Sequence, residues 1–480
     1  MKTKAFLGAA GLASVVIVLG QLNVEAVPGS ATDPGEGGVF QPIGGGIGPD
    51  VIVCQLPSTV KWATSGTETS YSIATTSANI GDENLDWVAS PSVRHPVISQ
   101  NMYRYRDGVM EHIGQSWLKH SFCALQLTGC GPCAGGGGCL SFLRPGCRDP
   151  YSASRNGSQG GLGPKWQVNA HTGQFSVPWD QGAGTSGDFN RRLRVNNVDL
   201  DPDLNPGAKY FIASMYVALD DAAANNRHNN ASYRQVTVNP TTFNLAMSGS
   251  TVTETAAIEA WDDFVPSVVL QDVFVAEENV DSSMTDARYI VANNVTDNGD
   301  GTWDYEYAVY NMNSHRSVGA FSVPMAPGVN VTDIEFHDVN YHSGEAWDST
   351  DWAVQVGADA ITWQTEPYSD NEQANALRWD TMYNFRFTAD TPPADATATM
   401  SLFRPGASAD PTVVVSAPSA GEPCGGDFDG DGSVGFTDLV SLLSAWGPCV
   451  GCPQDLDGSG DVGFADLVSL LSAWNGCIGG

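Results

Sequence analysis

The chain has 480 residues, a formal net charge of −32 and 42% hydrophobic residues. This length predicts two to four domains, and the hydrophobic content is sufficient for packed cores, which excludes a purely disordered acidic chain. The acidic excess argues against a nucleic-acid partner, because phosphates would be repelled.

Residues 1–26 have the pattern of a secretory signal peptide. Two lysines precede the apolar run "AFLGAAGLASVVIVLG", and small residues suited to cleavage end at Ala26. An uncleaved anchor is the alternative, but the run is short for a membrane span. We therefore expect a secreted protein, extracellular or on the cell surface, with no membrane span after signal removal. A Gly/Pro-rich linker over 27–49 follows.

The block over 50–265 is predicted to be a strand-rich domain with a cysteine-stapled loop. Its short apolar runs, such as "DVIVCQL" and "KYFIASMYVAL", are broken by Gly, Asn, Asp and Pro, as is typical of strands. The segment 108–126 is ambiguous between helix and strand.

The ten cysteines fall into two even sets, which in an exported protein indicates disulfides. The candidates are Cys54, Cys123, Cys130, Cys133, Cys139 and Cys147 in the body, and Cys424, Cys449, Cys452 and Cys477 at the end. A zinc site over Cys130 to Cys147 is the alternative. The intervening "AGGGG" favours disulfides, because a flexible loop gains most from cross-links.

The block over 266–410 is predicted to be a β-sandwich of Ig-like type. Turn residues at 298–301 precede an alternating run in which one face is apolar and the other polar. The expected buried face holds Trp303, Tyr305, Tyr307 and Val309, and the expected solvated face holds Asp304, Glu306 and Ala308. A linker is predicted over 411–423. The expected fold is thus mainly β, with two strand-rich domains before a small helical module.

Two polar clusters in the body are candidate sites. His337, Asp338, His342 and Glu345 could compose a two-His, one-carboxylate metal site, or be ordinary loop residues. His95, His112 and His120, among Arg104, Arg106, Glu111 and Lys119, could line a cleft, although a solvated surface is the favoured interpretation.

Aromatic residues are dense in the second block. Trp347 and Trp352 flank a polar loop and are the best candidates for exposed rings that stack on sugars, although core burial is the favoured interpretation for all of these aromatics, Trp363 and Trp379 included. No residue pattern identifies catalytic groups, and none are assigned.

Residues 427–446 and 455–474 are near-copies offset by 28 residues. Each copy opens with an acidic loop whose oxygens recur at the spacing that wraps a chain around one Ca²⁺. The predicted ligands are Asp427, Asp429, Asp431, Ser433 (carbonyl) and Asp438 in the first loop, and Asp455, Asp457, Ser459, Asp461 (carbonyl) and Asp466 in the second. Two calcium ions are therefore expected.

Each loop leads into a short amphipathic helix. Apolar residues recur at i, i+3, i+4 and i+7: Leu439, Leu442, Leu443 and Trp446 in the first copy, and Leu467, Leu470, Leu471 and Trp474 in the second. One such stripe leaves its apolar side chains in water, so two facing stripes are expected to form a small core.

With no helix entering either loop, residues 424–480 resemble the dockerin type I repeat, a module that docks secreted bacterial proteins onto cohesin domains. The resemblance implies the same ligand roles and a cohesin-like or cell-surface partner. Position 9 of each loop is Gly435 or Gly463 here, where water would replace a side-chain ligand. The end cysteines are predicted to pair as Cys424–Cys477 and Cys449–Cys452; the alternative is Cys424–Cys449 with Cys452–Cys477.

The body resembles uncharacterised secreted bacterial proteins with the same kind of tail, which implies no activity. The favoured hypothesis is a non-catalytic, calcium-binding extracellular assembly protein. The alternative is a polysaccharide-degrading O-glycosyl hydrolase or a carbohydrate-binding protein, targeted by its tail.

Overall fold

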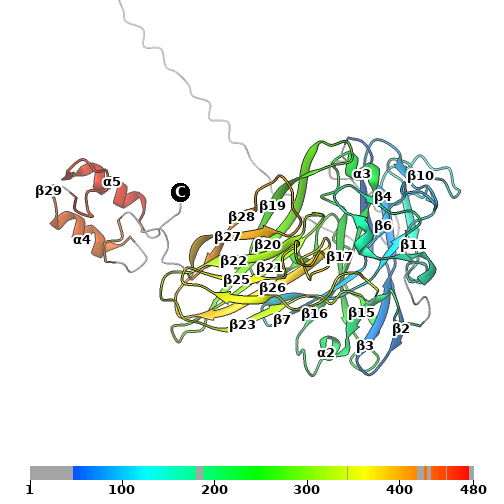
Figure 1. Cartoon of the computed structure of the whole chain (residues 1–480), viewed down its shortest axis with the longest axis horizontal. Coiled ribbons are helices and arrows are strands. Elements are labelled where there is room, and N and C mark those ends of the chain that lie inside the picture. Colours follow the sequence, from blue (N-terminus) through cyan, green and yellow to red (C-terminus); the bar gives the residue numbers. More distant parts are fainter. Residues whose placement is uncertain are drawn as a thin grey trace, which may run out of the picture. The chain divides into compact units, whose positions relative to one another are not determined.

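The computed structural model describes residues 47–179, 187–342, 344–418, 426–429, 434–449 and 451–474. The predicted mainly β fold is confirmed (Figure 1). The predicted signal peptide and most of the linker over 27–49 lie outside the described residues.

The first strand-rich block, residues 47–265 (the N-terminal region), is built on an eight-stranded antiparallel sheet. Its strands are β6 (Val97–Ile98), β7 (Asn101–Arg106), β8 (Val109–Gln115), β9 (Leu118–His120), β12 (Leu162–Gly163), β16 (Lys209–Val217), β17 (Ala231–Val238) and β18 (Leu245–Met247). The ambiguous segment 108–126 therefore forms β8 and β9, not a helix. Pairing of β8 with β7 decides the structure here, because tertiary contacts override a weak local preference.

Smaller sheets and short helices complete the N-terminal region. The sheets are β1 (Val51–Gln55), β4 (Thr75–Asn79) and β11 (Arg148–Tyr151); β2 (Thr59–Thr64), β3 (Glu68–Ile73) and β15 (Leu193–Asn196); β5 (Leu85–Asp86) with β10 (Phe142–Leu143); and β13 (Val168–Asn169) with β14 (Gln174–Phe175). The helices are α1 (Ala153–Asn156), η1 (Gln159–Gly161), η2 (Lys165–Gln167), α2 (Asn197–Leu200), α3 (Leu219–Ala223) and η3 (Ala257–Trp261).

All six body cysteines form disulfides, which confirms that prediction over the zinc alternative. The pairs are Cys54–Cys130, Cys123–Cys139 and Cys133–Cys147. The first pair joins the glycine-rich loop over 130–147 to β1. The second joins the loop to the segment before it, and the third joins the two ends of the loop to each other. Disulfides of this kind are typical of proteins that fold in an oxidising compartment.

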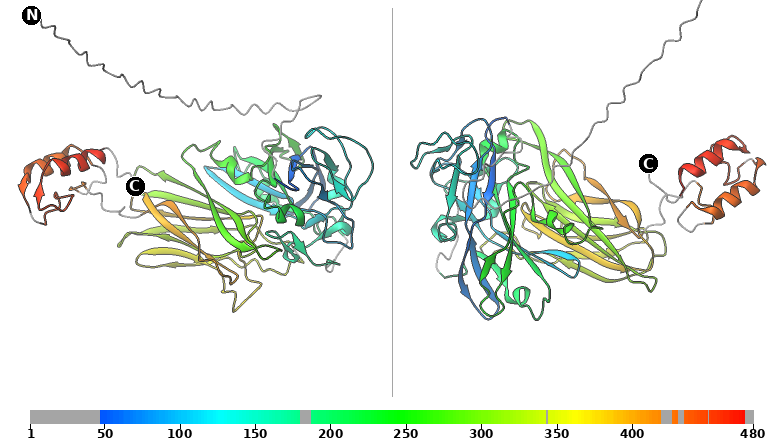
Figure 2. Two further views of the ribbon diagram at one scale, coloured as in Figure 1. Left: turned by 90° about the horizontal axis from the view of Figure 1, so that it is seen from above. Right: turned by 180° about the vertical axis from the view of Figure 1, so that it is seen from behind.

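The second block is a sandwich of two five-stranded antiparallel sheets (Figures 1 and 2). One sheet has the order β19 (Val269–Glu278), β20 (Met284–Asp297), β21 (Trp303–Asn311), β26 (Thr381–Ala389), β23 (Val331–His337). The other has the order β24 (Ala353–Val356), β25 (Ala360–Gln364), β22 (Val318–Pro324), β27 (Ala394–Leu402), β28 (Thr412–Ala417). Because β28 pairs with β27, the sandwich extends into the segment predicted as a linker over 411–423.

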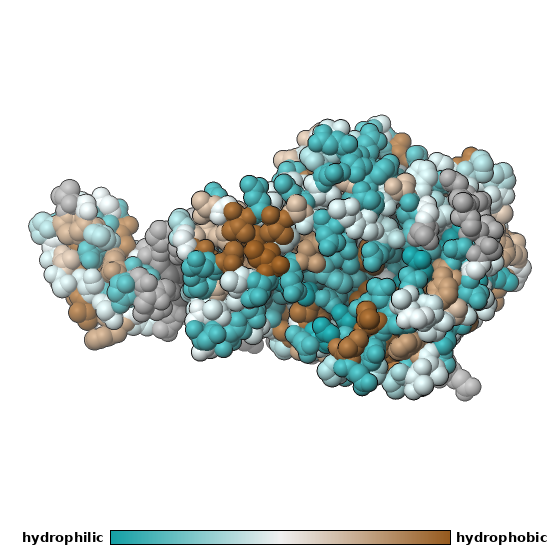
Figure 3. Space-filling view, turned by 60° about the horizontal axis from the view of Figure 1, so that its bottom comes forward, coloured by the Kyte–Doolittle hydropathy of each residue, from teal (hydrophilic) through white to brown (hydrophobic). Residues whose placement is uncertain are grey.

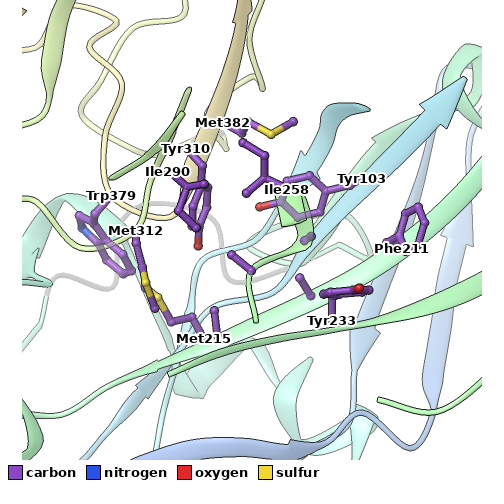
Figure 4. Close-up of a cluster of buried hydrophobic side chains, with 14 of the residues drawn as sticks. Tyr103, Phe211, Met215, Tyr233, Ile258, Ile290, Tyr310, Met312, Trp379 and Met382 are labelled. Carbon is purple, nitrogen blue, oxygen red and sulfur yellow. The ribbon is translucent and has the colours of Figure 1, made fainter. Parts of the chain in front are cut away.

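A hydrophobic core joins the N-terminal region to the sandwich, in addition to a core that each of them has of its own. Figure 4 shows this core from the inside. It joins Tyr103, Phe211, Met215, Tyr233 and Ile258 of the N-terminal region to Ile290, Tyr310, Met312, Trp379 and Met382 of the sandwich. This core covers part of the outer face of the sheet that contains β19 and β23, while Phe274 and Asp304 on that face are exposed.

Because the N-terminal region packs on this sheet, one face of β21 is less exposed to solvent than the sequence predicted. Tyr305 and Tyr307 are buried between the two sheets of the sandwich, as predicted. On the other face, where solvent was expected, Ala308 lies in the shared core and Glu306 is buried, while Asp304 is exposed. Alternation along a strand identifies its two faces but not what packs on each of them.

The C-terminal module contains two helices, α4 (Phe436–Ser444) and α5 (Phe464–Ser472), and a short ladder of β29 (Gly447–Pro448) with β30 (Asp461–Val462). Val434, Leu442, Val462 and Leu470 form its buried core. The predicted stripes are only partly inward: Leu443 and Leu471 are exposed, as is Trp446. A nine-residue helix packs too small a part of its surface against this core to bury all four residues of a stripe.

Candidate metal centre

Each loop of the C-terminal module brings three predicted carboxylate ligands together. Oxygens of Asp427, Asp429 and Asp438 lie within 4.8 Å of one another, and the same holds for Asp455, Asp457 and Asp466. The two triads occupy matching positions 28 residues apart. Each could hold a metal ion.

The last aspartate of each triad is fixed by backbone donors. Oδ1 of Asp438 accepts from the N–H of Phe428 at 2.7 Å, and Oδ2 accepts from the N–H of Gly435 at 2.8 Å. In the second loop, Asp466 accepts from Leu456 at 2.8 Å and from Gly463 at 2.7 Å. Asp438 and Asp466 therefore close their loops and also cap helices α4 and α5.

These backbone donors keep both carboxylates ionised. Burial opposes ionisation of Asp438, but the N–H groups of Gly435, Phe428 and Asp429 outweigh it and lower its pKa. The N–H of Gly463 is the largest cause of the lowered pKa of Asp466. A carboxylate that accepts several N–H bonds is stabilised in its charged form, which is the form that binds a cation.

The second loop is described throughout. The N–H of Ser459 donates to Oδ1 of Asp455 and of Asp457, each at 3.0 Å, and the N–H of Gly460 donates to Oδ2 of Asp455 at 2.8 Å. Gly460 adopts a φ of +90°, which a glycine accommodates at low cost. The carbonyl of Asp461, predicted as a ligand, accepts from the hydroxyl of Ser459 at 3.0 Å.

Several predicted residues lie outside the described part of the chain: Asp431, Ser433, Cys424 and Cys477. The predicted Cys449–Cys452 disulfide is confirmed. That pairing excludes the alternative of Cys424–Cys449 with Cys452–Cys477. The pairing of Cys424 with Cys477 stays a prediction.

The predicted histidine and carboxylate cluster at 337–345 is not a metal site within the described residues. His337 Nε2 lies 3.3 Å from the carbonyl of His112, and His342 Nε2 lies 3.1 Å from that of Phe189. Asp338 accepts from Asn375, and Glu345 accepts from the backbone of Lys165 and Trp166. The four side chains point to different partners, because the loop that carries them spreads over several elements.

The histidines predicted for a solvated surface are buried. His95 Nε2 and His120 Nδ1 are 3.1 Å apart, and the ring of His120 stacks on Trp179 at 3.8 Å. His112 stacks on Tyr103. Burial lowers the pKa of all three histidines, so they are neutral at pH 7.

The charged residues of the same stretch join the two parts of the body. Arg104 pairs with Glu111 at 2.5 Å and with Asp199 at 2.9 Å. Glu111 also pairs with Arg386 of the sandwich at 2.9 Å, and Arg386 reaches Glu306 at 2.7 Å. In this series of buried ion pairs each charged group has an oppositely charged neighbour. We therefore assign these residues a structural role.

Trp347 and Trp352, the candidates for sugar stacking, are buried, which agrees with the favoured interpretation that the aromatics of this block are core residues. Trp352 stacks on Phe336 and donates its indole N–H to the carbonyl of Asn375. Trp347 packs edge-on against Tyr341, and the guanidinium of Arg378 lies 4.9 Å from its ring. Contacts with Phe336, Tyr341 and Arg378 therefore hold both rings away from solvent.

A cleft of about 550 Å³ lies between the N-terminal region and the sandwich, and its lining includes His112 from one candidate polar cluster and His337, Asp338 and His342 from the other. Its polar lining includes Gln115, Arg194, Asp199, Asp338, Asn340 and Asp351. Asp338 belongs to the candidate cluster at 337–345, whereas Gln115, Arg194, Asp199 and Asp351 come from other parts of the chain. Figure 3 shows one face of the molecule, which is mostly hydrophilic, with hydrophobic residues in a few separate areas.

No family model matches this chain, and no curated protein matches it. Among solved structures, a chain titled "Biofilm associated protein - B domain" aligns with 76% of this chain and 86% of its own length. The identity is 9% and the TM-score is 0.11, so the likeness carries no argument about fold or function. Within the described residues, no helix has the length and apolar character needed to cross a membrane.

Proposed function

We propose that this is a secreted calcium-binding protein whose dockerin-like C-terminal module attaches it to a cohesin-like or cell-surface partner. The observation that carries the proposal is the pair of equivalent carboxylate triads, each closed by backbone N–H groups onto the start of a helix. Calcium prefers six to eight oxygen ligands, and carboxylates crowded this closely repel one another unless a cation lies between them. Ion binding and ordering of the module should therefore be coupled.

The exposed side of the module supports a docking role. Helix α4 presents Phe436, Val440 and Leu443 to solvent, and α5 presents Phe464, Val468 and Leu471 at the matching positions. We call these six residues the apolar face. Both phenylalanines are 73% exposed, and the other four side chains are 48–49% exposed. Large apolar side chains in repeated, solvent-exposed positions are typical of surfaces that bind a partner.

The docking proposal predicts that Phe436→Ser with Phe464→Ser abolishes partner binding without loss of calcium. Two buried aromatic anchors are worth roughly 2–4 kcal/mol each at an interface, so affinity should fall at least about 100-fold. The assay is binding of the full chain to purified cohesin-type domains and to intact bacterial surfaces, with calcium or with EDTA. Phe274→Ser is the matched control, because Phe274 is an exposed phenylalanine on the sandwich.

Binding that survives both the double substitution and EDTA would contradict this proposal. The calcium affinity of the double variant is measured by calorimetry. An unchanged affinity shows that partner binding was lost because the apolar face was altered and not because the ion was lost.

The second candidate, carbohydrate binding or hydrolysis by the body, is favoured by one observation, the polar cleft described above. Carboxylates, amides and a partly exposed Phe336 line it, and sugars are bound by such groups. The buried Trp347 and Trp352 do not contribute. A glycan array and a hydrolysis screen on the full chain test it. Sugar release that is lost in Asp338→Asn but kept in the exposed Asp351→Asn would favour an enzyme over an assembly protein.

A further inference from the structure

Lys165 and Asp380 form a buried pair at the junction of the N-terminal region with the sandwich. The Lys165 Nζ lies 3.9 Å from Oδ2 of Asp380, and the two side chains are 1% and 3% exposed. They are 215 residues apart in sequence. Neither group has a role in calcium binding or in the apolar face.

The surroundings of Lys165 exclude water and hold the amine in place. Nζ donates to Oε1 of Gln115 at 3.0 Å and to the backbone carbonyl of Asp380 at 3.2 Å. The ring of Trp379 lies 5.0 Å from Nζ. Burial is the largest influence on the pKa of Lys165 and lowers it, which favours the uncharged, nucleophilic amine.

The Asp380 carboxyl group is held by two neutral donors. The hydroxyl of Tyr310 donates to Oδ1 at 2.7 Å, and the amide of Asn101 donates to Oδ2 at 2.8 Å. Donors placed in this way stabilise negative charge that develops on a carboxyl oxygen when its carbon is attacked. Residue 380 has a φ of +54°, an uncommon conformation for a non-glycine residue.

A second carboxyl group, that of Glu345, lies beside Lys165. It accepts from the backbone N–H of Lys165 at 2.7 Å and from that of Trp166 at 3.1 Å. Burial raises its pKa, so it can take up and release a proton near neutral pH.

We infer that Lys165 and Asp380 are the two ends of an intramolecular isopeptide bond that covalently joins the N-terminal region to the sandwich. After proton transfer within the pair, the Lys165 amine attacks Cγ of the neutral Asp380 carboxyl group. An N–C bond forms, one C–O bond breaks, and the hydroxyl leaves as water with one of the amine protons. Glu345 accepts that proton and returns it to the leaving oxygen.

The reaction needs no oxidant or metal, and it replaces a buried ion pair with a neutral amide. Two charges held away from water are costly, and loss of both removes that cost. The inference goes beyond the proposed function, because it concerns the body and does not depend on calcium.

Intact mass spectrometry of the full secreted chain, denatured and with its disulfides reduced, tests the inference. The expected mass is one water molecule below that of the sequence from the measured N-terminus. Trypsin should fail to cleave after Lys165, and a branched peptide should join the segments that contain residues 165 and 380. A full mass together with normal cleavage after Lys165 would show an ion pair only and overturn the inference.

Substitutions identify the reacting atoms. Asp380→Ala should restore the full mass, whereas Asp380→Asn should form the same amide with loss of ammonia and give the cross-linked mass of the wild type. Lys119→Ala is the matched control, because Lys119 is also buried and should leave the mass deficit unchanged. Glu345→Gln should leave a fraction of the chain uncross-linked. The wild-type mass decides the question even if a variant fails to fold.

Discussion

Replacing Arg386 by methionine is expected to lower the free energy of unfolding by about 3–5 kcal/mol at pH 7. Arg386 lies between Glu111 of the N-terminal region and Glu306 of the sandwich, at 2.9 Å and 2.7 Å. Both carboxylates are about nine-tenths buried. Methionine fills a similar volume but leaves the two carboxylates without this partner, which is more costly than removal of the whole network.

The destabilisation should depend on pH in a defined direction. Burial raises the pKa of Glu111, but the charges of His337, Arg386 and Arg104 outweigh it and lower the pKa from 4.5 to about 2. A carboxyl group with a depressed pKa contributes stability above its unfolded value, and this contribution is lost as pH falls from about 4.5 towards 2. The difference between wild type and Arg386→Met should therefore narrow in that range.

Urea unfolding of both proteins at pH 7 and at pH 3.5 measures this effect, with Arg94→Met as the control. Arg94 also pairs with a carboxylate, Asp86 at 2.7 Å, but its side chain is 59% exposed. Surface pairs contribute under about 1 kcal/mol. If Arg386→Met is no more destabilising than Arg94→Met, the buried network does not hold the two parts of the body together.

Replacing Asp438 and Asp466 together by asparagine is expected to weaken calcium binding at both loops by about 100-fold, or about 3 kcal/mol per site. Each aspartate is a member of its triad and also accepts N–H groups across its loop. Asparagine keeps the size and one carbonyl oxygen but removes the charge and one acceptor. Because calcium binding and folding of the module are coupled, the double variant should also lose the helical structure of α4 and α5.

The measurement is a calcium titration of the full chain, followed by calorimetry and far-UV circular dichroism. Asp461→Asn is the matched control, because Asp461 lies in the same loop and is exposed, and its side chain is not part of the triad. Equal affinity of the double variant and the control would show that the triads are not the calcium site.

The C-terminal module was predictable because its information is local. The spacing of its aspartates and the starts of α4 and α5 are contained in a 28-residue repeat, and the paired Cys449 and Cys452 are only three residues apart. The burial of particular side chains was less predictable. Leu443 and Leu471 continue the apolar periodicity yet are exposed, because two short helices bury only the innermost residues of each stripe.

The body shows the same division between local elements and the burial of particular side chains. Its strands follow from alternation and turn residues, so β16, β19 and β21 lie where the sequence places them. The solvated surface expected for the histidines near His112 was wrong, because burial there depends on contacts between distant segments. The Glu111–Arg386 pair joins residues 275 apart. The Lys165–Asp380 pair joins residues 215 apart. One sequence carries no signal for such pairs.

The most direct test of calcium-dependent docking is isothermal titration of the calcium-free full chain with CaCl₂, alongside its circular dichroism. The predicted result is two bound ions per chain with a gain of helical signal, reversed by EDTA. No binding heat, with the same spectrum in calcium and in EDTA, would contradict the account, since the carboxylate triads would then be acidic surface turns.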